Sequence, residues 1–137
     1  MGKLKKCIGL LIYNLLAKHL PVSYSYIKIG QVYLRRFCGK LILDKCGKNV
    51  NIEKNATFST RVEIGDNSGI GINASIGGKC FIGNDVMMGP NCTIYSRNHN
   101  FSNTQISMCF QGFQEEKPVH IGDDVWIGGN VIILPGV

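Results

Sequence analysis

A six-residue repeat runs through the second part of this 137-residue sequence and constrains its fold more than any other feature. In eight of the twelve repeats a glycine follows the apolar residue, and in nine of twelve the residue three places on is Asn, Asp or Gly. A period of six matches neither an α-helical turn nor the two-residue alternation of one long strand. The apolar positions are Cys46, Ile52, Phe58, Ile64, Ile70, Ile76, Ile82, Met88 and Ile94, then Ile121, Ile127 and Ile133.

Such a period fits short strands joined by tight corners, because Asn, Asp and Gly tolerate the left-handed backbone that a corner needs. Three strands close an 18-residue coil, and successive coils stack at about 4.8 Å with parallel pairing. Residues 18 apart then align, as in Cys46, Ile64 and Ile82, or in Ile52, Ile70 and Met88. The sequence predicts an all-β class, a parallel β-helix of about four coils over residues 46–137.

Residues 1–45 lie outside the repeat and predict a helical cap on the first coil. Apolar residues recur at helical spacing in two stretches. The first helix should end before Pro21, and the second near Gly39. The cap would cover the open edge of the coil. The apolar positions are Leu4, Ile8, Leu11 and Leu15, followed by Tyr26, Ile29, Tyr33 and Phe37.

Charge is divided unevenly between cap and body. Residues 1–54 hold eleven Lys/Arg and two Asp/Glu, a balance of 11 − 2 = +9, whereas residues 55–137 hold four and seven, a balance of 4 − 7 = −3. One interpretation is a peripheral membrane contact through residues 1–40, and the other is that the lysines only solvate a helix. Nucleic acid is not an expected partner, because the basic residues do not continue into the body and no reading motif accompanies them.

The six cysteines do not form the pattern of a disulfide framework. Cys46, Cys80 and Cys92 occupy repeat positions where neighbours carry small apolar residues, so we expect them in the core. No CxxC pair is present, no small-residue cleavage site follows the early apolar stretch, and no apolar run reaches the roughly 18 residues of a membrane span. The predicted location is the cytoplasm, peripheral to the inner face of the membrane if the cap binds lipid.

The repeat breaks between Ile94 and Ile121, a spacing of 27 that is not a multiple of six. Residues 97–118 should therefore leave the prism as a loop, and a long loop in a regular solenoid is commonly functional. His99 stands where that loop begins, and imidazole is suited to accept a proton near neutral pH. His120 should point outward, and His19 lies in the cap.

The segments flanking this loop carry a family resemblance. Residues 82–95 (IGNDVMMGPNCTIY) and 117–137 (KPVHIGDDVWIGGNVIILPGV) resemble the hexapeptide-repeat acyltransferases, in the maltose/galactoside O-acetyltransferase branch that includes capsule and O-antigen sugar acetyltransferases. The resemblance implies a left-handed coil, a homotrimer with active sites between prisms, and a role in polysaccharide biosynthesis. It also implies transfer of acetyl from acetyl-CoA to a sugar hydroxyl, with no metal.

The resemblance assigns roles to individual residues. His99 matches the family's general base, which deprotonates the acceptor for direct attack on the thioester. The Trp126-Ile127-Gly128-Gly129 segment matches the one beside the pantetheine arm, so Trp126, Gly128 and Gly129 are candidate cofactor contacts. Candidate acceptor contacts are Tyr95, Arg97 and Asn98. Glu115 or Glu116 either orients the imidazole or is a solvated loop charge.

Two rival interpretations follow. A zinc-binding carbonic anhydrase of the same prism type needs three histidines, whereas His99 and His120 lack a companion at ligand spacing. The other rival is a non-catalytic trimeric scaffold or binding module. The sequence stops at Val137, the fifth residue of a repeat, whereas related enzymes continue for further coils, so we hypothesise a shortened chain or an edge covered by another copy.

Overall fold

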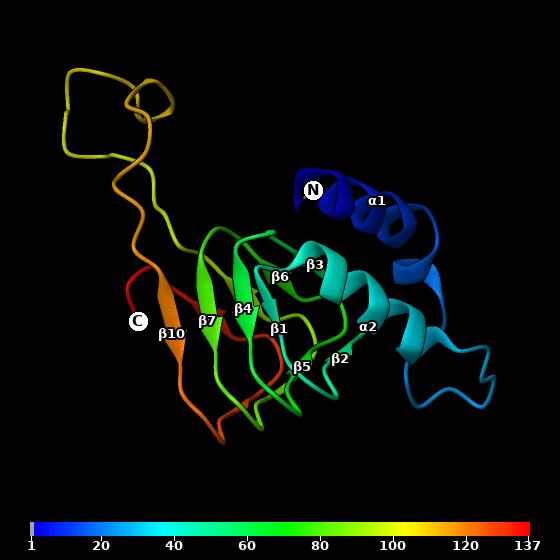
Figure 1. Ribbon diagram of the computed structural model, residues 1–137. Coiled ribbons are helices and arrows are strands. Elements are labelled where there is room, and N and C mark those ends of the chain that lie inside the picture. Colours follow the sequence, from blue (N-terminus) through cyan, green and yellow to red (C-terminus); the bar gives the residue numbers. More distant parts are fainter. Residues whose placement is uncertain (1) are drawn as a thin grey trace.

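The computed structural model describes residues 2–137 as a prism of short parallel strands preceded by helices (Figure 1). The helical elements before the prism are α1 (Gly2–Leu15), the 3-10 turn η1 (Ala17–His19) and α2 (Gln31–Ile42). The strands are β1 (Lys45–Cys46), β2 (Asn51–Ile52), β3 (Thr57–Phe58), β4 (Val62–Ile64), β5 (Gly69–Ile70), β6 (Ser75–Ile76), β7 (Cys80–Ile82), β8 (Met87–Met88), β9 (Thr93–Ile94), β10 (Val119–Ile121), β11 (Trp126–Ile127) and β12 (Ile132–Ile133).

Every third strand pairs in parallel, which makes three faces. The first face is the sheet β1-β4-β7-β10, and the third is β3-β6-β9-β12. The second face consists of the pairs β2-β5 and β8-β11, joined where the backbone N–H of Gly69 donates to Val86 O at 2.9 Å. Cys46 pairs with Ile64 and Ile64 with Ile82. The predicted 18-residue register is therefore confirmed, as is the parallel prism with N-terminal helices.

Asparagine and aspartate form two of the three corners of each coil. Each of these corner residues has a φ between 54° and 59°, in the left-handed region where their short side chains cost least. The corners also bond between coils: Asn73 Nδ2 donates to Asn91 Oδ1 at 3.0 Å, and Asn55 Nδ2 donates to Asn73 Oδ1 at 3.2 Å. The eight corner residues are Asn49, Asn55, Asn67, Asn73, Asp85, Asn91, Asp124 and Asn130.

The third corner, between the third face and the first, is different. Arg61 and Lys79 occupy the repeat position that holds Asn or Asp at the other corners, and neither has a positive φ. The loop emerges at this corner, after β9 and before β10 (Figure 1). His120 pairs with Phe81, a separation of 39 residues, so the insertion is 39 − 18 = 21 residues. The predicted loop over residues 97–118 occupies the connection between these strands.

The prism core consists of the inward-facing repeat positions. Ile52, Ile64 and Ile70 are fully buried, as are the smaller Cys80 and Cys92 at the second inward position of the repeat. Their interleaving of large and small side chains fills the narrow coil. The interpretation of Cys80 and Cys92 as core residues is confirmed, whereas Cys46 is only partly buried against the core.

The cap covers the first coil with hydrogen-bond donors and with the buried side chains of Ile42 and Leu43, and not with the predicted apolar stripes. Tyr13 donates its hydroxyl to Ala56 O at 2.8 Å, and Arg36 Nε donates to Val50 O at 2.8 Å. The buried Arg35 donates from Nε to Ile52 O, and its Nη2 lies 3.6 Å from Glu53 Oε2. These donors satisfy carbonyl groups at an edge that would otherwise be open.

The predicted faces of the two helices are therefore corrected. The stripes at Leu4, Ile8, Leu11 and Leu15 and at Tyr26, Ile29, Tyr33 and Phe37 point to solvent. The sides that pack inward carry Gly9 and Tyr13 on α1, and Arg35, Cys38 and Ile42 on α2. Gly39 lies within α2 and not at its end. Glycine is needed there because a Cβ would lie 2.7 Å from Ile52 Cδ1. Within residues 2–137, no helix has the length and apolar character needed to cross a membrane.

Candidate active site

The loop leaves the prism as a narrow antiparallel neck and widens to a tip with one 3-10 turn, η2 (Met108–Phe110). His99 forms a bridge with Phe113 across the neck, flanked by hydrogen bonds from Asn100 N to Gly112 O at 3.0 Å and from Gln114 N to Asn98 O at 2.9 Å. The loop stands away from the body of the prism (Figure 1). His99 is therefore held by backbone pairing at the neck and not at the tip.

A carboxylate fixes both ends of the neck to the prism. Glu116 accepts two hydrogen bonds from the guanidinium of Arg61 at 2.6 and 2.7 Å, one from Ser96 Oγ at 2.8 Å, and one from Lys79 N at 3.0 Å. The bonds from Arg61, followed by that from Ser96, lower the pKa of Glu116 to about 2. Gly78, with φ 73°, leaves the space for this cluster, because a Cβ there would lie 1.7 Å from Ser96 Oγ.

The imidazole of His99 is exposed and contacts Phe113, with ring centroids 4.2 Å apart and planes inclined by 33°. The guanidinium of Arg97 lies 4.9 Å from the centre of the same phenyl ring. Glu116 bonds to Arg61, Ser96 and Lys79 N and not to the imidazole, and no hydrogen bond to a His99 ring nitrogen is found within residues 2–137. Both ring nitrogens of His99 are thus free to meet a ligand or a neighbouring chain.

The structure brings two of the three predicted acceptor contacts together. Tyr95 and Arg97 line a hollow of about 230 Å³ at the third corner, together with Ser59, Arg61, Gly77, Gly78 and Ser96. Asn98 is absent from this hollow, and its carbonyl is used in the neck. The hollow lies directly before His99 in the chain, where a hydroxyl-bearing ligand would meet both cationic and hydroxyl groups.

The predicted cofactor contacts lie elsewhere on the same chain. Trp126 is on β11 in the second face, where it pairs with Met87 and is 77% exposed. Gly128 and Gly129 follow at the corner between the second and third faces, and a Cβ built on Gly128 would meet no atom within 4 Å. One chain therefore does not bring Trp126 into contact with His99. The open backbone at Gly128 suits the close approach of an extended arm.

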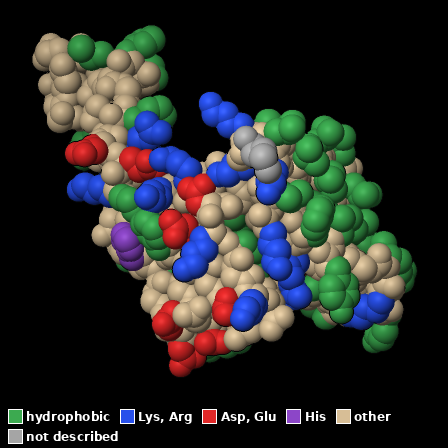
Figure 2. All heavy atoms as spheres, viewed as in Figure 1, with side chains coloured by type: hydrophobic (Ala, Val, Ile, Leu, Met, Phe, Trp, Pro, Cys, Tyr) green, Lys and Arg blue, Asp and Glu red, His purple; other side chains and the backbone are tan. Residues whose placement is uncertain are grey.

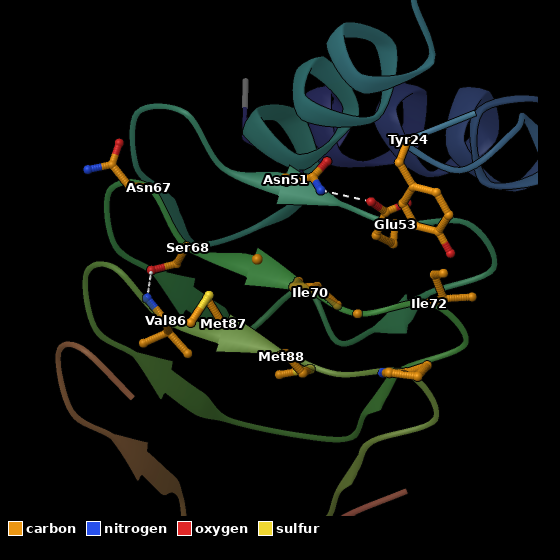
Figure 3. Close-up of a pocket in the computed structure, with 13 residues that line it drawn as sticks. Tyr24, Asn51, Glu53, Asn67, Ser68, Ile70, Ile72, Val86, Met87 and Met88 are labelled. Atoms are coloured by element: carbon orange, nitrogen blue, oxygen red, sulfur yellow. Dashed lines mark hydrogen bonds between the residues drawn. The ribbon is translucent and has the colours of Figure 1, made fainter. Parts of the chain in front are cut away.

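A larger cavity, of about 410 Å³, lies on the second face beneath Tyr24 of the cap (Figure 3). Asn51 and Glu53 from the first coil, and Ser68 and Met87 further along, line it. The repeat pattern does not reveal this cavity, because the cavity depends on the α1–α2 connection lying across the prism. The sequence feature that points to the cavity is Gly69. Asn51, Gly69 and Met87 occupy the same outward-facing position in successive coils, and the glycine leaves space between the other two side chains.

The other histidines have different surroundings. His120 points outward, as expected, and stacks on Phe81 with centroids 4.6 Å apart. His19 Nε2 lies 3.0 Å from Asn14 O in the cap. Across residues 2–137, no group of three or more His, Cys, Asp or Glu side chains is arranged to hold a metal ion.

The chain is similar to acetyltransferases of the hexapeptide-repeat type. It is 38% identical over 100 residues to a protein from Saccharomyces cerevisiae named as a candidate acetyltransferase, a match that covers 70% of this chain and 50% of that protein. The crystal structure of a maltose O-acetyltransferase from Clostridium difficile superposes with a TM-score of 0.71 and 26% identity, covering 98% of this chain and 68% of the other.

A hexapeptide-repeat acetyltransferase from Vibrio cholerae has a TM-score of 0.67 and 20% identity, covering 98% of this chain and 72% of its own, which shows a shared fold. The matched residues span 14% to 50% of the length of the curated relatives. No protein-family model matches it.

Proposed function

We propose that this chain is an O-acetyltransferase that moves an acetyl group from acetyl-CoA to a hydroxyl of a sugar or polysaccharide precursor, on a left-handed coil. The observation that carries the proposal is the position of His99. It stands at the neck of the one loop that interrupts the prism, and the Glu116 cluster anchors that neck on both sides. The similarity to a maltose O-acetyltransferase supports the reaction class and a sugar acceptor.

In the proposed mechanism His99 acts as general base. A ring nitrogen takes the proton of the acceptor hydroxyl while that oxygen forms a bond to the thioester carbonyl carbon. The carbonyl oxygen becomes an oxyanion, which backbone N–H groups or a neighbouring side chain stabilise. When the C–S bond breaks, the imidazolium returns its proton to the departing thiolate, so the enzyme ends the cycle unchanged.

The remaining sites follow from the open surfaces. We assign the acceptor to the hollow at Tyr95 and Arg97, beside the neck, and the acetyl-CoA arm to the Trp126, Gly128 and Gly129 edge. Since the two surfaces lie on different parts of one prism, we propose that they meet between copies in a homotrimer. The exposed apolar side chains of the loop support this assembly, because packing on a neighbour would bury them.

The direct test of the mechanism is His99→Gln, assayed by thiol release from acetyl-CoA across a panel of sugar acceptors. We expect transfer to fall by about 10²- to 10⁴-fold, the range for loss of a general base. His120→Gln is the matched control, because His120 stacks on Phe81 on another face. Full activity of His99→Gln, with an unchanged circular dichroism spectrum, would eliminate the proposed base.

The non-catalytic scaffold is the competing function, and acetyl-CoA binding separates the two. Calorimetry with the natural sequence should show binding, and Trp126→Ala should weaken it. If the chain folds and assembles but neither binds acetyl-CoA nor transfers acetyl to any acceptor, the scaffold interpretation replaces the enzyme.

A further inference from the structure

The cap presents a set of large apolar side chains to solvent, which we call the outer cap face. It comprises Leu4, Ile8, Leu11 and Leu15 on α1, the residues Tyr26, Ile27 and Ile29 of the connection, and Tyr33 and Phe37 on α2. All of these side chains are exposed, with Leu11 at 60% and Leu15 at 74%. Exposed apolar patches of this kind mark interaction surfaces. Neither the prism nor the proposed active site uses them.

The α1 part of the outer cap face is exposed because the opposite side of the helix is fixed by specific contacts. The four leucine and isoleucine positions form one stripe, whereas Gly9 and Tyr13 on the opposite side pack inward. Gly9 lies at the crossing with α2, where a Cβ would come within 2.7 Å of Leu41 Cβ. Tyr13 is fixed by its hydrogen bond to Ala56 O. Rotating α1 to hide the stripe would break both contacts.

Exposed lysines border this face: Lys3, Lys5, Lys28 and Lys40 are exposed, whereas Arg35 is buried beside Glu53 and Lys6 pairs with Asp44. Residues 2–43 contain eight Lys/Arg and no Asp or Glu, the first acid being Asp44. Lys3 and Lys5 are exposed beside the α1 stripe, and Lys40 is exposed about one turn beyond Phe37 on α2. Figure 2 shows hydrophobic side chains gathered over the helical end of the molecule, with Lys and Arg side chains among and beside them.

We propose that the outer cap face docks the protein on an anionic lipid membrane surface, lying in the headgroup layer without crossing it. An apolar stripe rimmed by lysines is the pattern of an interfacial helix, where the stripe enters the acyl boundary and the ammonium groups meet lipid phosphates. A second copy fits this face less well, since two caps would oppose like charges with no acid between them. Docking would hold the prism, and its acceptor hollow, at the membrane.

The test is vesicle co-sedimentation of the full chain, with phosphatidylcholine vesicles and with vesicles that contain about a third phosphatidylglycerol. We expect binding to the anionic vesicles, little binding to the neutral ones, and partial release as salt rises from about 0.1 M to about 0.5 M. The double variant Leu11→Glu/Leu15→Glu should lose binding by at least about tenfold, because it puts charge into the acyl boundary. Leu134→Glu is the matched control: it makes the same change on a leucine that is 56% exposed on the prism, and it should bind as the natural sequence does.

A second variant keeps the proposal testable if the double leucine variant does not fold. Lys3→Gln/Lys5→Gln removes two exposed charges, and each should weaken binding about fivefold. If the natural sequence and this variant each bound neutral and anionic vesicles equally, the proposed role of the lysines in binding anionic lipid would be wrong. Absence of vesicle binding by the natural sequence would overturn the proposal. A smaller oligomer for the leucine variant would also overturn it, and would show that the outer cap face is a contact between chains. None of these readouts depends on acetyl transfer.

Discussion

Asparagine at a prism corner serves the fold in two ways, through a backbone that accepts positive φ and through an amide that bonds to the next coil. Asn73 has φ 56°, receives a hydrogen bond from Asn55 and donates one to Asn91. Asn73→Gly keeps the backbone conformation and loses the ladder, whereas Asn73→Ala loses both. We therefore expect the alanine variant to be less stable than the glycine variant by about 1 kcal/mol, measured by urea denaturation.

Lys79 provides the control for that comparison. It occupies the same repeat position at the third corner, where φ is not positive. Lys79→Gly should therefore be less stable than Lys79→Ala, by about 0.5–1 kcal/mol, as at ordinary positions. If the alanine and glycine variants ranked in the same order of stability at Asn73 and at Lys79, tolerance of a left-handed backbone would not be the reason for asparagine at the corner.

At the scale of elements, the anchoring of the loop neck has a pH dependence with a definite sign. The pKa of Glu116 is lowered to about 2 in the folded chain, below the ordinary value of 4.5 that it regains on unfolding. Its carboxylate therefore contributes stability that is complete above about pH 5.5 and is lost as the pH falls toward about 2. The difference in unfolding free energy between the natural sequence and Glu116→Gln should be constant from about pH 7 to 5.5 and shrink at about pH 3.

The neighbouring glutamate is the matched control for this titration. Glu115 is exposed and has no hydrogen bond or ion pair within residues 2–137, so Glu115→Gln should change stability little at any pH. A Glu116→Gln difference that did not vary with pH would place the role of Glu116 in packing or in neutral hydrogen bonds. A large effect of Glu115→Gln would show that the charge of the whole neck matters.

The elements also show what the sequence could and could not predict. The repeat fixed the strands, the register and the loop corner because each coil buries the same kind of residue at the same place. The orientation of the cap was not predictable in this way. Burying the stripe on α1 would satisfy the hydrophobic pattern, but carbonyl groups of the first coil need donors, and Tyr13 and Arg35 supply them. The cavity beneath Tyr24 was missed for the same reason, since it depends on where the cap connection lies.

For the whole molecule, assembly is the property on which the proposed site depends. The loop exposes Phe101, Ile106, Met108, Phe110 and Phe113, and Phe110 is 81% exposed. A trimer that buries these side chains on neighbouring prisms would have a mass of about 45 kDa, three times 15.1 kDa. Light scattering on a sizing column should give that mass, and Phe110→Ser should shift the population toward single chains and lower acetyl transfer with it.

The cap variant used for membrane binding separates the two exposed apolar surfaces. If the loop faces a neighbouring copy and the outer cap face meets lipid, Leu11→Glu/Leu15→Glu should keep the mass of the natural assembly and lose only vesicle binding. Phe110→Ser should lower the mass of the assembly and keep vesicle binding. Its vesicle affinity should fall only modestly, because each particle then carries fewer caps. If instead the cap variant dissociates the assembly and the loop variant does not, copies join through their caps. The trimer built on the loop and the membrane surface on the cap would then both be wrong.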